Sequence, residues 1–207
     1  MLESCINLEI MSSESTDNII IDSQMTSEEA LAINSQNPAP KEILEVIEVL
    51  PVNYYGFDGL IHQGQIVMNK DVLDDIEKFF DLALKLKFPV KSVIPISDEK
   101  YYWNDDISCA DNNSSGFNYR LISGTTRMSR HSTGRAFDIN PVQNIYVRYE
   151  NMKEVFRAPK DGVYDKNTPG TLTSDHPLVL LMKEMGWEWG GAWTPKTGRE
   201  DYQHFEK

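Results

Sequence analysis

Residues 129–141 read Ser-Arg-His-Ser-Thr-Gly-Arg-Ala-Phe-Asp-Ile-Asn-Pro, with His131 and Asp138 seven positions apart. The small residues and the glycine between them predict a turn that leads into a short strand, which ends at Asn-Pro. A second histidine, His204, lies near the C-terminus in the stretch Asp201-Tyr-Gln-His-Phe-Glu. Two histidines and one carboxylate are the protein ligands of a catalytic zinc, which keeps a fourth position open. The three residues can form such a site only if the central and C-terminal strands are neighbours.

The spacing alone fits three unrelated surface residues better than it fits a metal site, so other features have to support the site. Asp201 precedes His204 by three positions. A turn at the strand entrance would place its carboxylate beside water at the metal as a general base, whereas in a regular strand the two side chains would face opposite sides. Arg120 ends a strand predicted over residues 116–120, where its guanidinium fits either a developing oxyanion or a surface salt bridge.

The composition is that of a globular protein with one folded domain. The chain has 207 residues, of which 40% are hydrophobic and 25% are charged. Residues 1–38 are rich in Ser, Asn, Gln, Asp and Glu and end in a proline-containing stretch. Such a segment cannot bury enough apolar surface to offset the entropy lost on ordering. We therefore predict a disordered acidic tail over residues 1–38 and a folded domain over residues 39–207.

Charge and hydropathy exclude several classes of partner. The formal net charge is -12, and the first forty residues hold seven acidic residues and no Lys or Arg, which leaves about -5 for the rest. No Lys/Arg stripe is present, so we expect no nucleic-acid partner. No apolar run approaches about 18 residues, so we expect no transmembrane segment. The first residues lack the basic and apolar regions of a signal peptide, and no export signal is visible.

The hydrophobic pattern predicts an α+β fold with a small antiparallel sheet and flanking helices, because strands and helices are interspersed without regular alternation. We expect a helix from Lys41 to Pro51, a hairpin over residues 52–69 with a turn at Gln63-Gly64, and a helix capped by Asn69. A buried strand is predicted over residues 90–96, and a further helix, capped by Ser174 or Asp175, ends at Met185. Short strands are predicted at residues 187–189 and 202–205.

Two sets of residues carry a resemblance to a known family. The pattern Ser129-x-His-x-x-Gly-x-Ala-x-Asp138 and the terminal stretch 201–206 resemble the zinc peptidases of the VanY-type D-alanyl-D-alanine carboxypeptidase and L-alanyl-D-glutamate endopeptidase family. Residues 57–59, 113–120 and 186–191 fit the same family, so that the resemblance covers about residues 40–206. It implies a DD-peptidase or hedgehog-like fold with zinc in a cleft. The implied substrates are peptidoglycan stem peptides, cut by a monomer in the cell envelope or outside the cell.

The resemblance also implies a role for each matching residue. It makes His131, Asp138 and His204 the zinc ligands, Asp201 the general base and Arg120 the group that stabilises the substrate carbonyl. By the same resemblance, Ser129 supports the metal-binding loop, and Asn118 and Trp189 contribute to the substrate cleft or its support. Three places depart from the family pattern, and we expect them at the rim of the cleft, where they would affect substrate preference: Ser132-Thr133, Arg135 and Asn144-Ile145-Tyr146.

Two alternatives remain open at the level of sequence. The protein could be a non-catalytic zinc domain that binds cell-wall peptide or a partner protein. Such a structural zinc needs a fourth protein ligand, for which His62, His176 and Glu206 are the candidates. A hydrolase that uses Cys109 with His131 has less support, because Cys109 and Cys5 are isolated and belong to no motif. Which peptide bond would be cut does not follow from the sequence.

Overall fold

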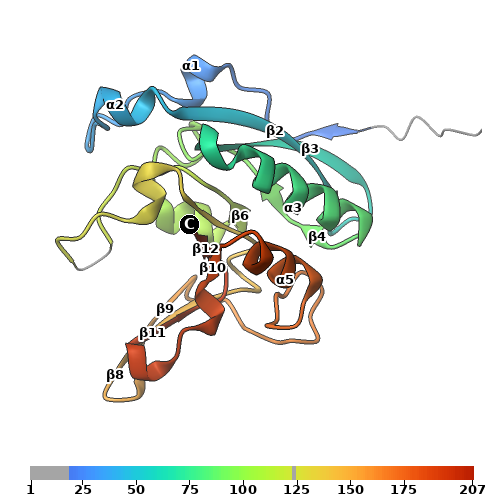
Figure 1. The fold of residues 1–207 in the computed structure, drawn as a ribbon, viewed down its shortest axis with the longest axis vertical. Coiled ribbons are helices and arrows are strands. Elements are labelled where there is room, and N and C mark those ends of the chain that lie inside the picture. Colours follow the sequence, from blue (N-terminus) through green and yellow to red (C-terminus); the bar gives the residue numbers. More distant parts are fainter. Residues whose placement is uncertain (1–18, 123–124) are drawn as a thin grey trace, which may run out of the picture.

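The computed structural model describes residues 19–122 and 125–207. Figure 1 shows a mixed α/β fold of several small sheets with few helices. The strand orders are β1-β3-β2-β4, β10-β12-β7, β11-β8-β9 and β5-β6. Within the described ranges, no helix is long and apolar enough to cross a membrane.

The bounds of the elements are as follows. The strands are β1 (Ile20–Ile21), β2 (Ile47–Gly56), β3 (Ile61–Asn69), β4 (Pro89–Val90), β5 (Ser92–Val93), β6 (Asn113–Ser114), β7 (Ala136–Asp138), β8 (Tyr146–Glu150), β9 (Lys153–Ala158), β10 (Glu188–Trp189), β11 (Arg199–Asp201) and β12 (His204–Glu206). The α-helices are α1 (Ser27–Ala30), α2 (Lys41–Leu44), α3 (Leu73–Lys85), α4 (Asp105–Ala110) and α5 (Pro177–Glu184). Short 3-10 turns are η1 (Lys70–Val72), η2 (Arg130–Thr133), η3 (Gly190–Ala192) and η4 (Pro195–Thr197).

The hairpin β2-β3 and helix α3 form the upper layer of the molecule in Figure 1. The predicted hairpin is confirmed, but its turn lies at residues 57–60 and not at Gln63-Gly64, which is inside β3. Helix α3 is also confirmed: the Asn69 side chain accepts a hydrogen bond from the backbone N–H of Asp71 at the start of η1. Its buried face consists of Ile76, Phe79, Phe80 and Ala83. This face fixes the helix over the core.

The helix predicted from Lys41 to Pro51 is wrong beyond its first turn. Helix α2 ends at Leu44, and residues 47–56 form β2. Buried and exposed side chains alternate along most of β2, which is the two-residue period of a strand. Pro51 is accommodated inside β2, since β4 pairs only with Tyr55 and Gly56 and leaves the rest of that edge open.

The prediction of a disordered tail over residues 1–38 is wrong for residues 20–31, and residues 1–18 lie outside the described part of the chain. Strand β1 pairs in parallel with β3. Further along, Ala30 in α1 is only 1% exposed and packs with Val67 and Phe117. The buried amide of Gln65 accepts hydrogen bonds from the Ser23 hydroxyl and the backbone N–H of Met25. The folded part therefore begins before residue 39.

The sheet β10-β12-β7 joins the two halves of the predicted site. It is antiparallel, with His204 opposite Asp138 and Phe205 opposite Phe137. The rings of Phe137 and Phe205 stack with their centroids 5.1 Å apart, and Phe79 of α3 meets both edge-on. This aromatic cluster anchors the sheet to the upper layer. The central and C-terminal strands are thus neighbours, which is the condition that a site made of these three residues has to meet.

Other expectations about the sheets need correction. The sheets are not uniformly antiparallel, because β1-β3, β2-β4 and β5-β6 are parallel pairs. The strand predicted over residues 90–96 is divided into the short β4 and β5. Residues 116–120 form no strand, since Phe117 and Asn118 donate their backbone N–H groups to Val67 of β3 and His131 of η2. The segment therefore ties the upper layer to the central turn.

Helix α5 begins later than predicted. Its N-terminal cap is neither Ser174 nor Asp175 but His176, whose Nδ1 accepts the backbone N–H of Leu178 at 3.3 Å. The imidazole packs edge-on against Phe88, with ring centroids 5.0 Å apart. His176 thus has a structural role as helix cap and packing partner of Phe88, apart from the predicted site residues.

Candidate functional site

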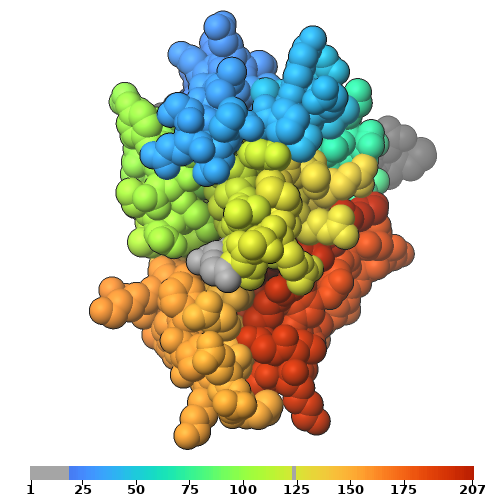
Figure 2. Space-filling model, turned by 90° about the vertical axis from the view of Figure 1, so that its left-hand side faces the viewer, coloured from blue at the N-terminus to red at the C-terminus, as the bar shows by residue number. Residues whose placement is uncertain are grey.

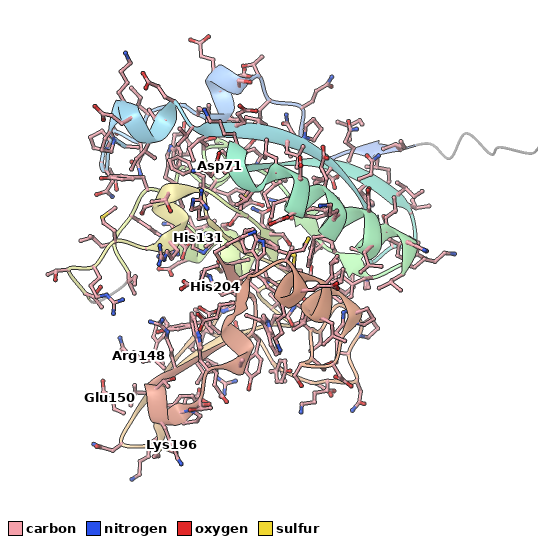
Figure 3. All side chains as sticks on the ribbon, viewed as in Figure 1. Asp71, His131, Arg148, Glu150, Lys196 and His204 are labelled. Carbon is pink, nitrogen blue, oxygen red and sulfur yellow. The ribbon has the colours of Figure 1, made fainter. Side chains whose placement is uncertain are left out.

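The predicted ligands come from three neighbouring elements. His131 lies in η2, Asp138 ends β7 and His204 begins β12. The Ser129 hydroxyl caps η2 by accepting the backbone N–H of His131 at 3.3 Å, as expected for a residue that supports this loop. Gly134 follows in the left-handed region (φ +65°), where the chain turns back into β7. In Figure 3 both histidines lie close together in the middle of the molecule.

One ligand atom of each residue points to a common centre. His131 Nε2 is 3.2 Å from Asp138 Oδ2, and His204 Nδ1 is 3.0 Å from Asp138 Oδ1. The two histidine nitrogens are 3.2 Å apart. All three side chains are buried, and within the described ranges this is the one His/Cys/Asp/Glu group compact enough to hold a metal ion. The structure therefore brings together the three residues that the sequence predicts as ligands.

The outer hydrogen bonds of the two histidines set their tautomers. His131 Nδ1 is 2.7 Å from the carbonyl oxygen of Gly116, and His204 Nε2 is 3.1 Å from Glu206 Oε2. A carbonyl and a carboxylate only accept, so each of these nitrogens carries the proton and donates. The inner nitrogens are then free to offer lone pairs beside the Asp138 carboxylate. Two imidazole lone pairs and a carboxylate fit a divalent cation such as zinc.

No fourth protein ligand joins this group in the part of the chain that the structure describes. His62 lies on β3 between Asp22 and Asp58, at 2.9 and 3.1 Å. Glu206 is bonded to the outer nitrogen of His204. His176, the remaining candidate, caps α5. A metal held by the three ligands would retain a position for water or substrate, as a catalytic zinc does.

Buried charge makes the centre favourable for a cation. Burial would raise the pKa of the Asp138 carboxyl, but the neighbouring His131 and His204 hold it below its ordinary value. Burial would likewise lower the pKa of His204, yet its hydrogen bonds to Asp138 and Glu206 outweigh this and raise the pKa to about 10. The carboxylates therefore stabilise positive charge at this position: a proton on His204 Nδ1 supplies it at neutral pH, and a metal ion that displaces this proton would supply it instead.

Asp201 lies on β11, a strand separate from that of His204. Residues 202 and 203 turn the chain between β11 and β12. Asp201 and His204 therefore do not lie on one regular strand, in which their side chains would face opposite sides. Burial, reinforced by the charge of Asp138, raises the pKa of the Asp201 carboxyl to about 7, although His204 opposes the shift. Its Oδ1 atom is buried and has no hydrogen-bond partner among the described residues. Asp201 also lines the cavity described below, and no group among the described residues occupies its Oδ1 atom.

Arg120 is held in place by residues that sequence reasoning did not single out. Its Nη2 atom is 2.7 Å from Asp105 Oδ2. The Ser132 hydroxyl accepts the backbone N–H of Arg120 at 2.9 Å and donates to its carbonyl oxygen at 2.8 Å. The only available signal for Asp105 was its place in the polar stretch 104–106, since loops on a rigid scaffold often contribute to sites.

These groups surround one cavity of about 370 Å³, lined by the three candidate ligands, Asp201 and Arg120 among others. Figure 2 views the molecule from this side, with the segment before His131 in yellow-green above the orange β8-β9 hairpin and the red C-terminal strands. The cavity is large enough for a few residues of a peptide.

Asn118 and Trp189 do not line this cavity, so the expectation that they contribute directly to the substrate cleft is wrong. Asn118 is buried and donates to Asp105 Oδ1 at 3.3 Å, so it supports the partner of Arg120. Trp189 is 2% exposed and donates its indole N–H to the carbonyl oxygen of Tyr202. The tryptophan that lines the cavity is instead Trp193, whose ring centroid is 5.7 Å from that of His204.

The departures from the family pattern are mostly away from the cleft rim. Ser132 is buried behind Arg120, and Arg135 pairs with Asp71 at 2.8 Å outside the cavity. Tyr146, by contrast, lines the cavity as expected. Cys109 also reaches the cavity, but burial raises the pKa of its thiol well above the ordinary value. A buried thiol of this kind is a poor nucleophile, which argues against a cysteine hydrolase.

Comparison with known proteins agrees with the C-terminal half of this site. Residues 123–207 match a family model described as D-alanyl-D-alanine carboxypeptidase, which confirms the resemblance over that range. The match includes His131, Asp138, Asp201 and His204, whereas Arg120 and residues 57–59 lie outside it. No curated protein and no solved structure matches the chain. The DD-peptidase-like fold therefore stays a prediction.

Proposed function

We propose that the protein is a zinc-dependent peptidase that hydrolyses peptide bonds in the stem peptides of bacterial peptidoglycan. The proposal is supported by the match of residues 123–207 to a family model described as D-alanyl-D-alanine carboxypeptidase. The observation that supports this most is the convergence of two histidine lone pairs and the Asp138 carboxylate beside a cavity that also holds Asp201. The site of action would be the cell envelope or the space outside the cell, where this substrate is found. A monomer is sufficient, because all these residues come from one chain.

His131 through Nε2, Asp138 through its carboxylate and His204 through Nδ1 would hold the metal. When bound, zinc supplies a Lewis acid for the substrate carbonyl and lowers the pKa of water to about 7. Gly116 and Glu206 keep the protons of the two histidines on the outer nitrogens. These contacts orient the rings and preserve their ability to bind the metal.

Asp201 acts as the general base. Its ionised carboxylate takes a proton from the attacking water, and the protonated form then gives this proton to the leaving amine as the carbon–nitrogen bond breaks. A carboxyl with a pKa of about 7 is matched to both steps at neutral pH. Asp201 lines the cavity, and its Oδ1 atom has no hydrogen-bond partner among the described residues, which fits a carboxylate that takes up and releases a proton.

Arg120 donates to the substrate carbonyl oxygen as negative charge develops on it. Its guanidinium stays oriented through Asp105, while the buried Nε atom lacks a partner among the described residues. Preorganised donors of this kind stabilise a transition state more than a ground state. Asp105 therefore orients the Arg120 guanidinium, and Asn118 holds Asp105 in place.

A non-catalytic zinc domain is the competing function. Structural zinc is bound by four protein ligands, and the three-residue group with an adjacent base favours an enzyme instead. Incubation of the zinc-loaded protein with purified peptidoglycan, followed by mass analysis of the released fragments, tests the proposal. Release of D-alanine would identify a carboxypeptidase, and cleavage between L-alanine and D-glutamate an endopeptidase. Absence of any new fragment would contradict both.

A further inference from the structure

The sheet β11-β8-β9 presents two rows of side chains to the cavity. In the first row Asp201 is opposite Tyr146, which is opposite Ala158. In the second row Arg199 is opposite Arg148, which is opposite Phe156. All six residues line the cavity. The arginines of the second row thus share a wall with the proposed general base.

This arrangement of arginines is unfavourable without a ligand. Like charges directly opposite each other on neighbouring strands repel. Arg120, Arg135 and Arg157 each form an ion pair with a carboxylate. Arg148 and Arg199 have none within the described ranges, and the same holds for Arg127 and Arg130, which line the cavity from the segment before His131. The Nε atom of Arg148 is also buried without an acceptor. On this sheet, two neighbouring positive charges and an unused donor therefore face the cavity.

Aromatic rings orient both guanidinium groups. Arg199 lies over the ring of Trp193 at 4.1 Å from its centroid, and Arg148 lies over Phe156 at 5.5 Å. Stacking of this kind holds the planar group while its N–H edges remain free to donate. The pair is therefore preorganised to bind a planar anion by parallel hydrogen bonds, as arginine does with carboxylates.

We propose that Arg148 and Arg199 bind a free carboxylate of the substrate close to the scissile bond. This inference rests on the proposed peptidase function and adds a determinant of specificity to it. The two rows are two residues apart along the strands, roughly 7 Å, so the bound carboxylate lies within one or two residues of the bond that Asp201 serves. A peptide ending in D-Ala-D-Ala has such a carboxylate at its terminus, and an L-Ala-D-Glu bond has one on the glutamate.

The test compares each carboxylate peptide with its amide. The substrates are an acetylated peptide ending in D-Ala-D-Ala, an L-Ala-D-Glu peptide, and the two matched amides, assayed with the zinc-loaded full chain. The variants are Arg148→Gln and Arg199→Gln, with Arg199→Lys to keep the charge while removing the planar fork. Arg157→Gln is the control, because Arg157 lies on β9 of the same sheet but pairs with Glu154. Zinc content and thermal unfolding verify that each variant is folded.

The wild type should cleave one acid peptide at least about tenfold more efficiently than its amide, the size of a lost hydrogen bond to a charged group. Arg148→Gln and Arg199→Gln should raise KM for that acid about tenfold or more and leave the amide nearly unchanged, with Arg199→Lys in between. Which acid responds identifies the source of the carboxylate. Equal losses on acid and amide would overturn the arginine site alone. No cleavage of any peptide by the wild type would overturn the proposed function and the arginine site with it.

Discussion

Asp138 and His204 lie directly opposite each other in the antiparallel pair β7-β12, with Asp138 Oδ1 3.0 Å from His204 Nδ1. Strand pairing thereby joins residues that are 66 positions apart in the chain. The third candidate ligand, His131, reaches the same centre from the turn that precedes β7. A metal site thus depends on the register of one short sheet, and the predictions below follow from that geometry.

Asp201→Asn should leave zinc binding intact and reduce hydrolysis of stem peptides by about 10²-fold to 10⁴-fold. The amide has nearly the shape of the carboxylate but cannot accept a proton from water. Zinc content by atomic absorption and kcat by fragment release measure the two properties on one sample. If the variant loses its zinc together with its activity, Asp201 has a role in holding the metal instead.

The pH dependence of kcat/KM should show an acid limb that reports Asp201. Burial raises the pKa of this carboxyl to about 7, and the base works only when ionised, so activity falls as pH falls through that pKa. The positive charge of bound zinc lowers the pKa, which places the limb at or below about 7. A profile measured from about pH 5 to 8 that stays flat would argue against Asp201 as the base.

Arg120→Lys should lower kcat about 10²-fold to 10³-fold without loss of zinc. Lysine keeps the charge but cannot hold Asp105 and a substrate oxygen at the same time with a planar fork. Arg135→Lys is the matched control, because Arg135 pairs with Asp71 outside the cavity. Equal activity of the two variants would remove Arg120 from the mechanism.

Gln65→Ala should destabilise the fold by about 1–3 kcal/mol. The Gln65 amide bonds Ser23 and Met25, so the substitution releases the N-terminal segment from β3. Gln63→Ala is the control on the same strand, where the side chain makes a single exposed hydrogen bond and the change should stay within about 0.5 kcal/mol. Urea unfolding gives both values. Equal stability of the two variants would mean that residues 20–31 contribute little to folding.

The sequence predicted the parts of the structure that depend on local pattern. The apolar face of α3 and the hairpin β2-β3 have strong periodic signals. The pattern over residues 41–50 predicts a helix wrongly, because apolar residues in its first half fit either period and Pro51 resembles a helix stop. The composition of the N-terminal segment predicts a tail, because its few apolar residues give no sign that it pairs with the edge of β3 and bonds to Gln65.

In the site, too, some features follow from local sequence pattern and others depend on contacts between distant parts of the chain. His131, Asp138 and His204 lie together as a ligand set requires, and the resemblance to a known family, more than their spacing, indicates them as candidates. Trp189 and Trp193 flank a glycine pair, and only the register of β10 decides that the first is buried in the core while the second reaches the cavity. Asp105 and the pair Arg148 and Arg199 have no motif. Their roles arise from contacts between strands and loops that are distant in sequence.

The central claim is that His131, Asp138 and His204 hold the metal on which hydrolysis depends. The most direct test measures zinc content and stem-peptide cleavage together in His131→Ala and His204→Ala. His62→Ala and His176→Ala are the controls, because each removes a histidine that lies outside the site. We expect the first two variants to lose both zinc and cleavage and the controls to retain both. Full cleavage by a zinc-free wild type, or stoichiometric zinc in His131→Ala and His204→Ala, would contradict the claim.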